Sequence, residues 1–391
     1  MTGTARSELI GSMVRPPEVI DAFMRVFPSR DLLGQFPQGQ GRPADRRHFA
    51  EVTEAAIGDL IRRQAEAGID VVVNGEFGRW TWWMGLYGAL AGFAMDREPI
   101  VARDGHGGTR TLYVPRIDRK VARVANPAAD EARTLARLTS GPFKITLPAA
   151  SRELTFWGRP VLGPEVYDAG VYADPDQAFA DLLAAEREVL DEVVAAGAAY
   201  VQLDYPVYTH AADPSWLKVF RDGGVGRDEL IDRAIDIDNA MIDGLPAGVT
   251  TGLHLCRGNI GTMFLARGAL DEVAERVFGQ LRYDRLLIEW SEPGRHGGFG
   301  ALRFVPPGTT VVLGIVNTKS REVETEDELL RTIDDAARYL DLGQLAISPQ
   351  CGFSSAVGIN DAADVQWRKI DVMCRVADRV WGGHQDRPEL P

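Results

Sequence analysis

The sequence is poor in cysteine and has neither a long apolar segment nor an excess of positive charge. Only three of its 391 residues are cysteine, namely Cys256, Cys351 and Cys374. So small and odd a number in a long chain argues against a disulfide framework and for reduced thiols. No apolar run approaches the roughly 20 residues that a transmembrane helix needs. The first residues also lack the apolar core of a signal peptide, so we expect a cytoplasmic protein with no membrane partner.

The charge balance is acidic, with 43 Lys and Arg against 56 Asp and Glu and a formal net charge of −13. Such a chain offers no general attraction to the phosphates of nucleic acids or to anionic lipids. Its hydrophobic fraction of 45% is typical of soluble globular proteins with a sizeable core. We therefore expect small-molecule partners and no nucleic acid, and the sequence leaves open whether the protein forms a homo-oligomer.

Short apolar runs alternate with helical patterns along the chain, which is typical of a parallel sheet wrapped by helices. The candidate strands span residues 7–12, 68–77, 142–149, 198–206, 248–256, 283–290, 309–317 and 343–351. Several are almost continuously apolar, as strands covered on both faces should be. Eight such units predict an α/β fold of the (β/α)8 or TIM barrel type. No linker or shift in composition divides the chain, so we expect a single domain over residues 1–391.

The helices between these strands are predicted from apolar residues at helical spacing. The clearest patterns cover residues 50–68, 174–190, 228–245 and 326–343. Asp174 before Pro175 has the composition of an N-cap followed by a first turn. Gly343 is expected to end the last of these helices, because glycine tolerates the left-handed conformation there.

Two stretches interrupt the alternation. Residues 13–50 are rich in Pro, Gly, Gln and Arg and predict an extended loop after the first strand. Residues 78–141 predict a hairpin-like insertion after the second strand. This insertion begins with four aromatic residues, Trp80, Trp82, Trp83 and Tyr87. Both stretches would lie at the catalytic face of a barrel, where the aromatic residues form either a small hydrophobic cluster under a loop or a direct contact with substrate.

Side chains that can bind a metal lie at the ends of three candidate strands. His254 and Cys256 are two residues apart, so on a strand they project to the same face. Glu289 ends the sixth candidate strand and Cys351 ends the eighth, so all four side chains are expected at one rim. Two thiolates and an imidazole suit Zn²⁺ better than Mg²⁺ or Ca²⁺. Zinc keeps a bound thiol in its nucleophilic thiolate form, which favours alkyl transfer to sulfur.

The alternative for each of these residues is a place in the core. A lone His or Cys in an apolar strand is more often a packed core residue than a metal ligand, and His-x-Cys alone is a weak motif. The convergence of three strand ends is what favours a metal site. Cys374 provides the contrast, because its helical spacing predicts a position on a buried helix face.

Eight short motifs run along nearly the whole chain. They are IGS at 10–12, NGEF at 74–77, SGP at 140–142, QLDYP at 202–206, HLC at 254–256, IEWS at 288–291, VNTKS at 316–320 and SPQCG at 348–352. In this order they resemble the catalytic barrel of the cobalamin-independent methionine synthase family. The resemblance implies that His254, Cys256, Glu289 and Cys351 bind Zn²⁺. The zinc would activate the homocysteine thiol for attack on a methyl group carried by a folate, and so form methionine.

The resemblance also implies that Ser12, Glu76 and Asp204 bind the amino-acid part of homocysteine. Two carboxylates at strand ends suit an ammonium group, and Ser12 with its backbone N–H suits a carboxylate. Asp204 and Lys319 are the candidate catalytic residues, and Lys319 would give a proton to the donor or supply positive charge. The alternative is that Glu76 pairs with Arg79 and that Asp204 caps a helix.

Three departures from the family pattern concern the donor side. Tyr205 and Asn317 stand where the family usually has acidic residues, and Trp157 comes later than the family's pterin-stacking Trp. The main expectation is a zinc-dependent methyltransferase that uses a methyl-folate or a related donor and a small thiol. One alternative is a different zinc-dependent alkyl transfer, or C–S or C–N bond chemistry. Another is a zinc-binding protein without catalytic activity.

Overall fold

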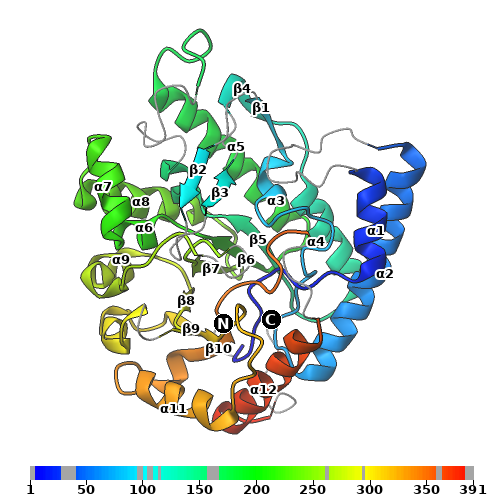
Figure 1. Ribbon diagram of the computed structural model, residues 1–391, viewed down its shortest axis with the longest axis vertical. Helices are drawn as coiled ribbons and strands as arrows, with labels where there is room; N and C mark the ends of the chain where they lie inside the picture. The colour runs from blue at the N-terminus through cyan, green and yellow to red at the C-terminus, as the bar shows by residue number, and fades with distance from the viewer. Residues whose placement is uncertain are drawn as a thin grey trace.

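A parallel sheet of six strands forms the centre of the molecule, and helices lie around it (Figure 1). The computed structural model describes residues 5–27, 41–94, 100–103, 109–112, 116–155, 167–259, 264–292, 296–357 and 363–383. The strands of the central sheet are β5 (Lys144–Pro148), β6 (Tyr200–Asp204), β7 (Thr250–Leu255), β8 (Arg285–Glu289), β9 (Thr310–Val316) and β10 (Leu345–Pro349). Their order is β10-β9-β8-β7-β6-β5. This is an α/β fold in which strands that follow one another along the chain are also neighbours in the sheet.

Six of the eight predicted strands are confirmed, each shorter than predicted. All residues of β5, β6, β8, β9 and β10 are buried. This agrees with their nearly continuous apolar sequences, which predicted coverage on both faces.

The first two candidate strands, 7–12 and 68–77, are corrected to segments that make only isolated parallel bridges. The bridges join Ser7 to Ile347, Glu8 to Val71, and Val72 to Phe143. They link β10, at one edge of the sheet, through both segments to the residue that precedes β5, at the other edge.

Local hydrogen bonding and backbone geometry limit strand pairing at one end of each of these two segments. The backbone N–H groups of Arg6 and Ser7 donate to the Asp70 carboxylate at 2.6 and 3.0 Å instead of extending a ladder. At the other end of the second segment, Gly75 and Glu76 have φ angles of 67° and 56°. This left-handed conformation is incompatible with a strand.

The helices surround the sheet in Figure 1. They are α1 (Pro17–Val26), α2 (Pro43–Ala67), α3 (Met84–Tyr87), α4 (Pro127–Leu138), α5 (Pro175–Ala195), α6 (Tyr208–Ala211), α7 (Pro214–Asp222), α8 (Arg227–Ile242), α9 (Ala274–Gln280), α11 (Glu326–Ala336) and α12 (Ala363–Trp381). Short 3₁₀ helices are η2 (Ala150–Thr155), η3 (Leu270–Glu272), η4 (Phe299–Phe304) and η5 (Leu342–Gln344). Within the described residues, no helix is both long and apolar enough to cross a membrane.

The predicted helix positions are confirmed with one change. Asp174 is the N-cap of α5, and its side chain accepts a hydrogen bond from the Asp176 N–H. However, α11 ends at Ala336, so the prediction that this helix continues to Gly343 was wrong. Asp341 instead accepts a hydrogen bond from the Gly343 N–H at 2.7 Å and begins the separate turn η5.

The prediction of an extended loop over residues 13–50 was also wrong. This stretch contains α1 and the first residues of α2, while residues 28–40 lie outside the described part. Both helices begin with proline, which is favoured in the first helical turn because its missing N–H would have no partner there. Two of the prolines that suggested a loop, Pro17 and Pro43, therefore mark helix starts.

The predicted insertion at 78–141 contains two antiparallel ladders. One joins β1 (Leu90–Ala94) to β4 (Arg116–Arg123), and the other joins β2 (Ile100–Arg103) to β3 (Thr109–Leu112). The segment then continues into α4, which packs against α5.

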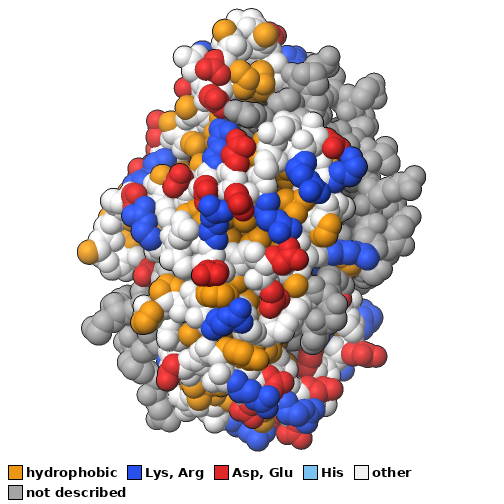
Figure 2. Space-filling model, turned by 90° about the vertical axis from the view of Figure 1, so that its left-hand side faces the viewer, with side chains coloured by type: hydrophobic (Ala, Val, Ile, Leu, Met, Phe, Trp, Pro, Cys, Tyr) orange, Lys and Arg blue, Asp and Glu red, His pale blue; other side chains and the backbone are white. Residues whose placement is uncertain are grey.

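Acidic and basic side chains are mixed on the face of the molecule that Figure 2 shows, with orange apolar groups scattered between them. No large area of one charge stands out on this face. The described residues of this face therefore offer no extended basic surface of the kind that attracts a nucleic-acid backbone.

A buried carboxylate fixes the first bridged segment against the sheet. Glu8 is completely buried, and its two oxygens lie 2.7 Å from Lys144 Nζ and 2.7 Å from an Arg285 guanidinium nitrogen. The Tyr200 hydroxyl also donates to Glu8, at 3.0 Å. Burial alone would raise the pKa of Glu8, but the charges of Lys144 and Arg285 lower it to about 2. Ion pairs at both carboxylate oxygens of Glu8 therefore hold this segment against the sheet.

We predict that Glu8→Gln destabilises the protein by about 3–5 kcal/mol, because it leaves two buried cations without their anion. The effect is measured by urea unfolding at pH 7. The Glu8 pKa is about 2 in the folded protein and near 4.5 when unperturbed. Its contribution is therefore complete above pH 4.5 and is lost as the pH falls towards 2, and the variant lacks this part of the acid sensitivity.

The matched control is Asp222→Asn, which breaks the exposed pair with Lys218 on α7. Its effect should stay below about 1 kcal/mol, because exposed pairs contribute little. Equal unfolding free energies for wild type and Glu8→Gln would contradict the role assigned to Glu8.

Candidate functional site

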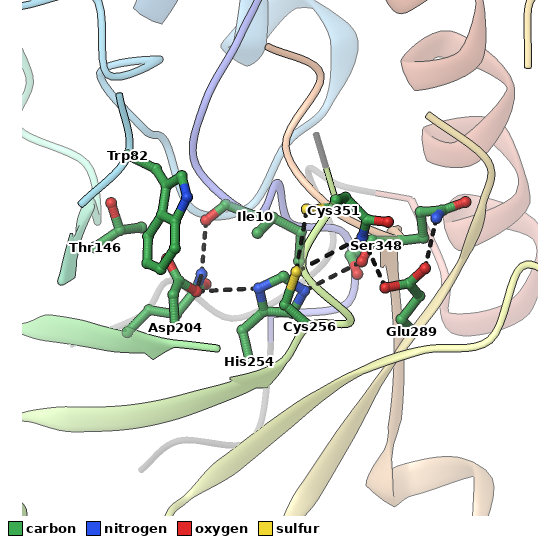
Figure 3. A network of polar contacts seen from close by, with 12 residues as sticks. Ile10, Trp82, Thr146, Asp204, His254, Cys256, Glu289, Ser348 and Cys351 are labelled. Atoms are coloured by element: carbon green, nitrogen blue, oxygen red, sulfur yellow. Dashed lines mark hydrogen bonds and ion pairs between the residues drawn. The ribbon is translucent and has the colours of Figure 1, made fainter. Parts of the chain in front are cut away.

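Three of the four predicted metal ligands come together in a buried cluster (Figure 3). The ligand atoms of His254, Cys256 and Cys351 all lie within 4.8 Å of one another. The two sulfur atoms are 3.6 Å apart. His254 lies near the end of β7 with Cys256 just beyond it, and Cys351 follows β10 by two residues. The carboxyl ends of these parallel strands therefore supply the cluster, as the sequence predicted.

Asp204 fixes the His254 ring from the neighbouring strand. The β6–β7 register places the two residues opposite each other, and Asp204 Oδ1 lies 3.1 Å from His254 Nδ1. Gln202 Nε2 donates to the same carboxylate oxygen at 2.7 Å. Burial alone would lower the pKa of His254, but the Asp204 hydrogen bond and the Cys256 charge raise it to about 9. Carboxylate–histidine pairs of this kind commonly orient an imidazole for a metal. His254 Nε2 lies 3.1 Å from the Gln350 backbone carbonyl oxygen, and a metal bound at Nε2 would replace this contact.

The two thiols have different environments. The hydrogen bond with Cys351 and the nearby His254 lower the pKa of the Cys256 thiol to about 7, although burial opposes the shift. The pKa of Cys351 is raised well above its ordinary value by the same hydrogen bond and by burial. The Gly258 N–H also donates to Cys256 Sγ, at 3.4 Å. Two sulfurs and one imidazole at this spacing fit the ligand set that zinc prefers.

Glu289, the fourth predicted ligand, is not a member of this cluster. Its Oε1 accepts hydrogen bonds from Gln350 Nε2 at 2.7 Å and from Lys319 Nζ at 3.2 Å. Its Oε2 accepts from Asn259 Nδ2 at 2.8 Å and from the Arg257 N–H at 3.2 Å. Burial would raise the pKa of Glu289, but the charge of Lys319 and other nearby cations lower it. The carboxylate is therefore ionised and surrounded by donors.

Lys319, predicted as a catalytic group, contacts Glu289 and is largely buried. The turn that carries it is fixed by Asn317, whose side-chain oxygen accepts the N–H groups of Lys319 at 2.8 Å and Ser320 at 3.2 Å. Asn317 thus stabilises the turn, and its amide oxygen can accept these two hydrogen bonds without the charge of an acidic residue.

Glu76 lies at the same end of the sheet and retains an unused acceptor. Its Oε1 accepts a hydrogen bond from Thr146 at 2.8 Å and lies 3.5 Å from Arg79. Its buried Oε2 has no hydrogen-bond partner among the described residues. Burial raises the pKa of Glu76. The alternative pairing with Arg79 is thus present, but it leaves one carboxylate oxygen unsatisfied, and Asp204 binds His254 instead of capping a helix.

Ser12 lies beside the segment that carries Cys351. Its carbonyl accepts the Phe353 N–H at 2.8 Å. A Cβ at Gly352 would lie only 2.0 Å from Ser12 Oγ, so this close approach requires glycine. The structure therefore brings Ser12 to the same region as the sulfur cluster.

The aromatic residues predicted at the start of the insertion have different surroundings. Trp80 is buried in a small hydrophobic cluster with Phe23, Met84 and Val357. Trp82 packs instead against the cluster of Tyr205, Cys256 and Cys351, with its ring centroid 6.1 Å from that of Tyr205. Of the two roles considered, Trp80 has the packing role, and Trp82 lies next to the sulfurs. Trp157 lies outside the described residues.

Tyr205 is connected to a buried histidine behind the sulfur cluster. Its φ angle of 63° is unusual for a bulky residue. Its hydroxyl lies 2.7 Å from His210 Nε2, and His210 stacks on Trp216 with ring centroids 4.2 Å apart. Burial lowers the pKa of His210 to about 3, so this imidazole is neutral. The wall beside Cys256 is therefore aromatic and carries no charge from His210.

Three neighbours of the cluster were missed by sequence reasoning: Gln202, Asn259 and Gln350. The sequence signal that could have identified them is proximity to the motifs. Gln202 and Gln350 lie within motifs that supply candidate site residues, and Asn259 lies three residues after one. Their contacts join different strands, so no local pattern reveals them.

Residues 29–377 match the family described as "Cobalamin-independent synthase, Catalytic domain". The chain belongs to this family. The uncharacterised protein YxjH of Bacillus subtilis (strain 168) is 30% identical over 96% of this chain and 94% of its own length. The methionine synthase of Pyrococcus abyssi is 22% identical over 88% of this chain and 85% of its own length.

Solved structures show the same fold. The B12-independent methionine synthase from Shewanella sp. W3-18-1, solved with selenomethionine, superposes with a TM-score of 0.68 at 17% identity and covers 96% of this chain and 98% of that chain. The resemblance inferred from the motifs is confirmed, and the family supports a methyl-transfer role as in methionine synthase. This methionine-synthase-like enzyme therefore acts on small molecules.

For this enzyme we predict a pH-dependent contribution of His210 to stability. The unfolded chain binds a proton at this histidine below about pH 6.5, whereas the folded protein does not until about pH 3. The free energy of unfolding should therefore fall with decreasing pH in this window, by up to about 1.4 kcal/mol per pH unit more in wild type than in His210→Gln. Chemical unfolding at several pH values between 7 and 4 measures the difference.

His48→Gln is the control, because His48 is exposed on α2. Its unfolding free energy should follow the wild-type pH profile. Parallel profiles for wild type and His210→Gln would show that His210 is not held neutral.

Proposed function

We propose that the enzyme is a zinc-dependent S-methyltransferase, which transfers a methyl group from a methyl-folate or a related donor to a small thiol such as homocysteine. The observation that carries the proposal is the buried cluster of one imidazole and two thiols within 4.8 Å, in a chain of this family. His254, Cys256 and Cys351 hold the zinc, and Glu289 is the fourth ligand or its close neighbour. When bound, zinc supplies a Lewis acid that keeps the substrate sulfur as a thiolate.

The remaining residues position and surround the reacting groups. Asp204 orients His254 by its hydrogen bond, which makes it a positioning residue in this proposal. Lys319 keeps the Glu289 carboxylate ionised by its positive charge. Cys256 and Cys351 are buried beside Trp82, which limits the access of water to the thiols.

The amino-acid part of the thiol binds near Glu76 and Ser12 in this proposal, with Asp204 beside them. The support is the buried Glu76 oxygen that has no hydrogen-bond partner among the described residues. An ammonium group from the substrate satisfies such an oxygen and removes the unfavourable burial of an unpaired acceptor.

The central sheet acts as the wall of an eight-stranded barrel in a single cytoplasmic domain. The segments around Glu8 and Val72 take the places of the first two strands, and residues 78–141 form an insertion after the second of them. Support comes from the bridges that link both sheet edges through these segments.

A second candidate is alkyl transfer from a donor other than a folate, including the opening of an epoxide by the thiol. The aromatic wall of Trp82 and Tyr205 beside the sulfurs favours it, because an apolar alkyl group packs well there. Comparing methyl-folate with other donors in the same thiol assay separates the two candidates.

We expect the purified enzyme to contain one zinc per chain and to lose its thiol-dependent methyl transfer when the metal is removed. Cys351→Ala should lower zinc content and reduce transfer by about 100-fold or more, because it deletes a ligand. Zinc content, transfer rate and the sulfur count from zinc-edge X-ray absorption, with and without homocysteine, are measured together.

Cys374→Ala is the matched control, since Cys374 is buried in the core on α12. It should keep the zinc and the activity. Full activity after complete zinc removal would end the proposal, and zinc that never gains a substrate sulfur would favour a non-catalytic site.

We predict that Glu76→Gln raises the KM for homocysteine by roughly 10-fold or more, because it removes the charge that attracts the ammonium group. The KM for an amine-free thiol such as 3-mercaptopropionate should change little. Zinc content should remain that of wild type, which separates substrate binding from metal binding. An equal change of KM for both thiols would contradict an ammonium site at Glu76.

A further inference from the structure

Asn259 connects two groups of the candidate metal centre. It lies beyond the end of β7, three residues after Cys256, and it is buried. Its side-chain nitrogen donates to Glu289 Oε2 at 2.8 Å and to Cys256 Sγ at 3.6 Å. We infer that Asn259 is a positioning residue of the zinc centre, whose single amide group holds the Cys256 sulfur and the Glu289 carboxylate in one arrangement. The inference rests on the proposed function.

The orientation of the Asn259 amide follows from its partners. A carboxylate oxygen and a thiolate are both acceptors, so the side-chain nitrogen must face them. The other end of the amide, Oδ1, is buried and has no hydrogen-bond partner among the described residues. Burying an unpaired carbonyl is unfavourable. The amide therefore keeps this orientation because of the two bonds that its nitrogen donates.

The backbone before Asn259 is shaped to bring the amide to this place. Gly258 has a φ of 76°, and a Cβ there would lie 2.5 Å from the Tyr205 hydroxyl oxygen. Only glycine fits this conformation and this contact. The Gly258 N–H also donates to Cys256 Sγ. Residues 258 and 259 therefore turn two consecutive donors towards the same sulfur.

The rest of the Glu289 carboxylate is held independently of Asn259. Gln350 and Lys319 bind its Oε1, and the Arg257 N–H shares its Oε2 with Asn259. Loss of the amide should thus leave Glu289 in the site but remove the side chain that joins its Oε2 to the Cys256 sulfur. We expect this loss to weaken metal binding more than it weakens folding, because polar neighbours of metal ligands typically change metal affinity 10- to 100-fold.

The test uses Asn259→Leu, which has a similar size and no donor, and Asn259→Ser, whose short side chain removes the amide with less crowding. Zinc dissociation constants are measured by competition with a chromophoric chelator. We expect both variants to bind zinc 10- to 100-fold more weakly than wild type. Asn259→Gln, which keeps the side-chain donor, should recover part of the affinity.

Ser355→Ala is the matched control, because the Ser355 hydroxyl donates to the Asn259 backbone carbonyl and leaves the side-chain amide untouched. Its zinc affinity should stay within about twofold of wild type. Thermal unfolding of the metal-free proteins shows whether each variant folds. If Asn259→Leu does not fold, the zinc affinity of Asn259→Ser tests the role of Asn259.

The outcomes separate this inference from the proposed function. Tight zinc binding by wild type and equal binding by Asn259→Leu or Asn259→Ser would overturn the role of Asn259 and leave the zinc centre standing. Failure of wild type itself to bind zinc would instead overturn the proposed function, and the role of Asn259 with it. A loss of affinity in both variants with recovery in Asn259→Gln supports the inference.

Discussion

Curvature of the parallel sheet is the constraint on which the candidate site depends. Three strand spacings separate β7 from β10 in the order of the sheet. At about 4.8 Å per spacing, a flat sheet would keep residues at their ends roughly 14 Å apart. Yet the sulfurs of Cys256 and Cys351 are 3.6 Å apart. Cys256 and Cys351 lie one and two residues beyond their strands, and isolated bridges link the two edges of the sheet, so the strand ends converge on one cluster. The proposed metal chemistry depends on this convergence as well as on the residue types.

A curved sheet requires contacts that hold its two edges together, and the segment that contains Glu8 supplies some of them. Its segment bridges to β10 on one side and to Val71 on the other. Lys144 on β5 and Arg285 on β8 bind the same carboxylate, so one buried anion ties together strands from both halves of the sheet. A buried charge of this kind costs desolvation, which is tolerated because both carboxylate oxygens are satisfied by cations.

The sequence predicts the repetitive part of this molecule well and the irregular part poorly. Continuous apolar runs identified six strands, and strand ends identified His254, Cys256 and Cys351, because both signals are local. The first two strand candidates were wrong. The Asp70 carboxylate binds backbone N–H groups at the start of the first segment, and the left-handed Gly75 and Glu76 interrupt the second. The role of Asn259 was invisible because its partner Glu289 lies 30 residues away along the chain.

Glu289 and Glu76, two buried carboxylates of the proposed site, show how the same chemical group can have different uses. Glu289 receives four hydrogen bonds from protein donors, so its charge is already stabilised and it can serve a metal without a substrate present. Glu76 has an oxygen without a partner among the described residues, and its pKa is raised by burial. A cationic ligand stabilises the ionised form of Glu76. An ammonium group bound there would therefore offset the unfavourable burial of the unpaired carboxylate oxygen. In the proposed function, this difference between the two carboxylates assigns Glu289 to the metal and Glu76 to the amino group of the thiol.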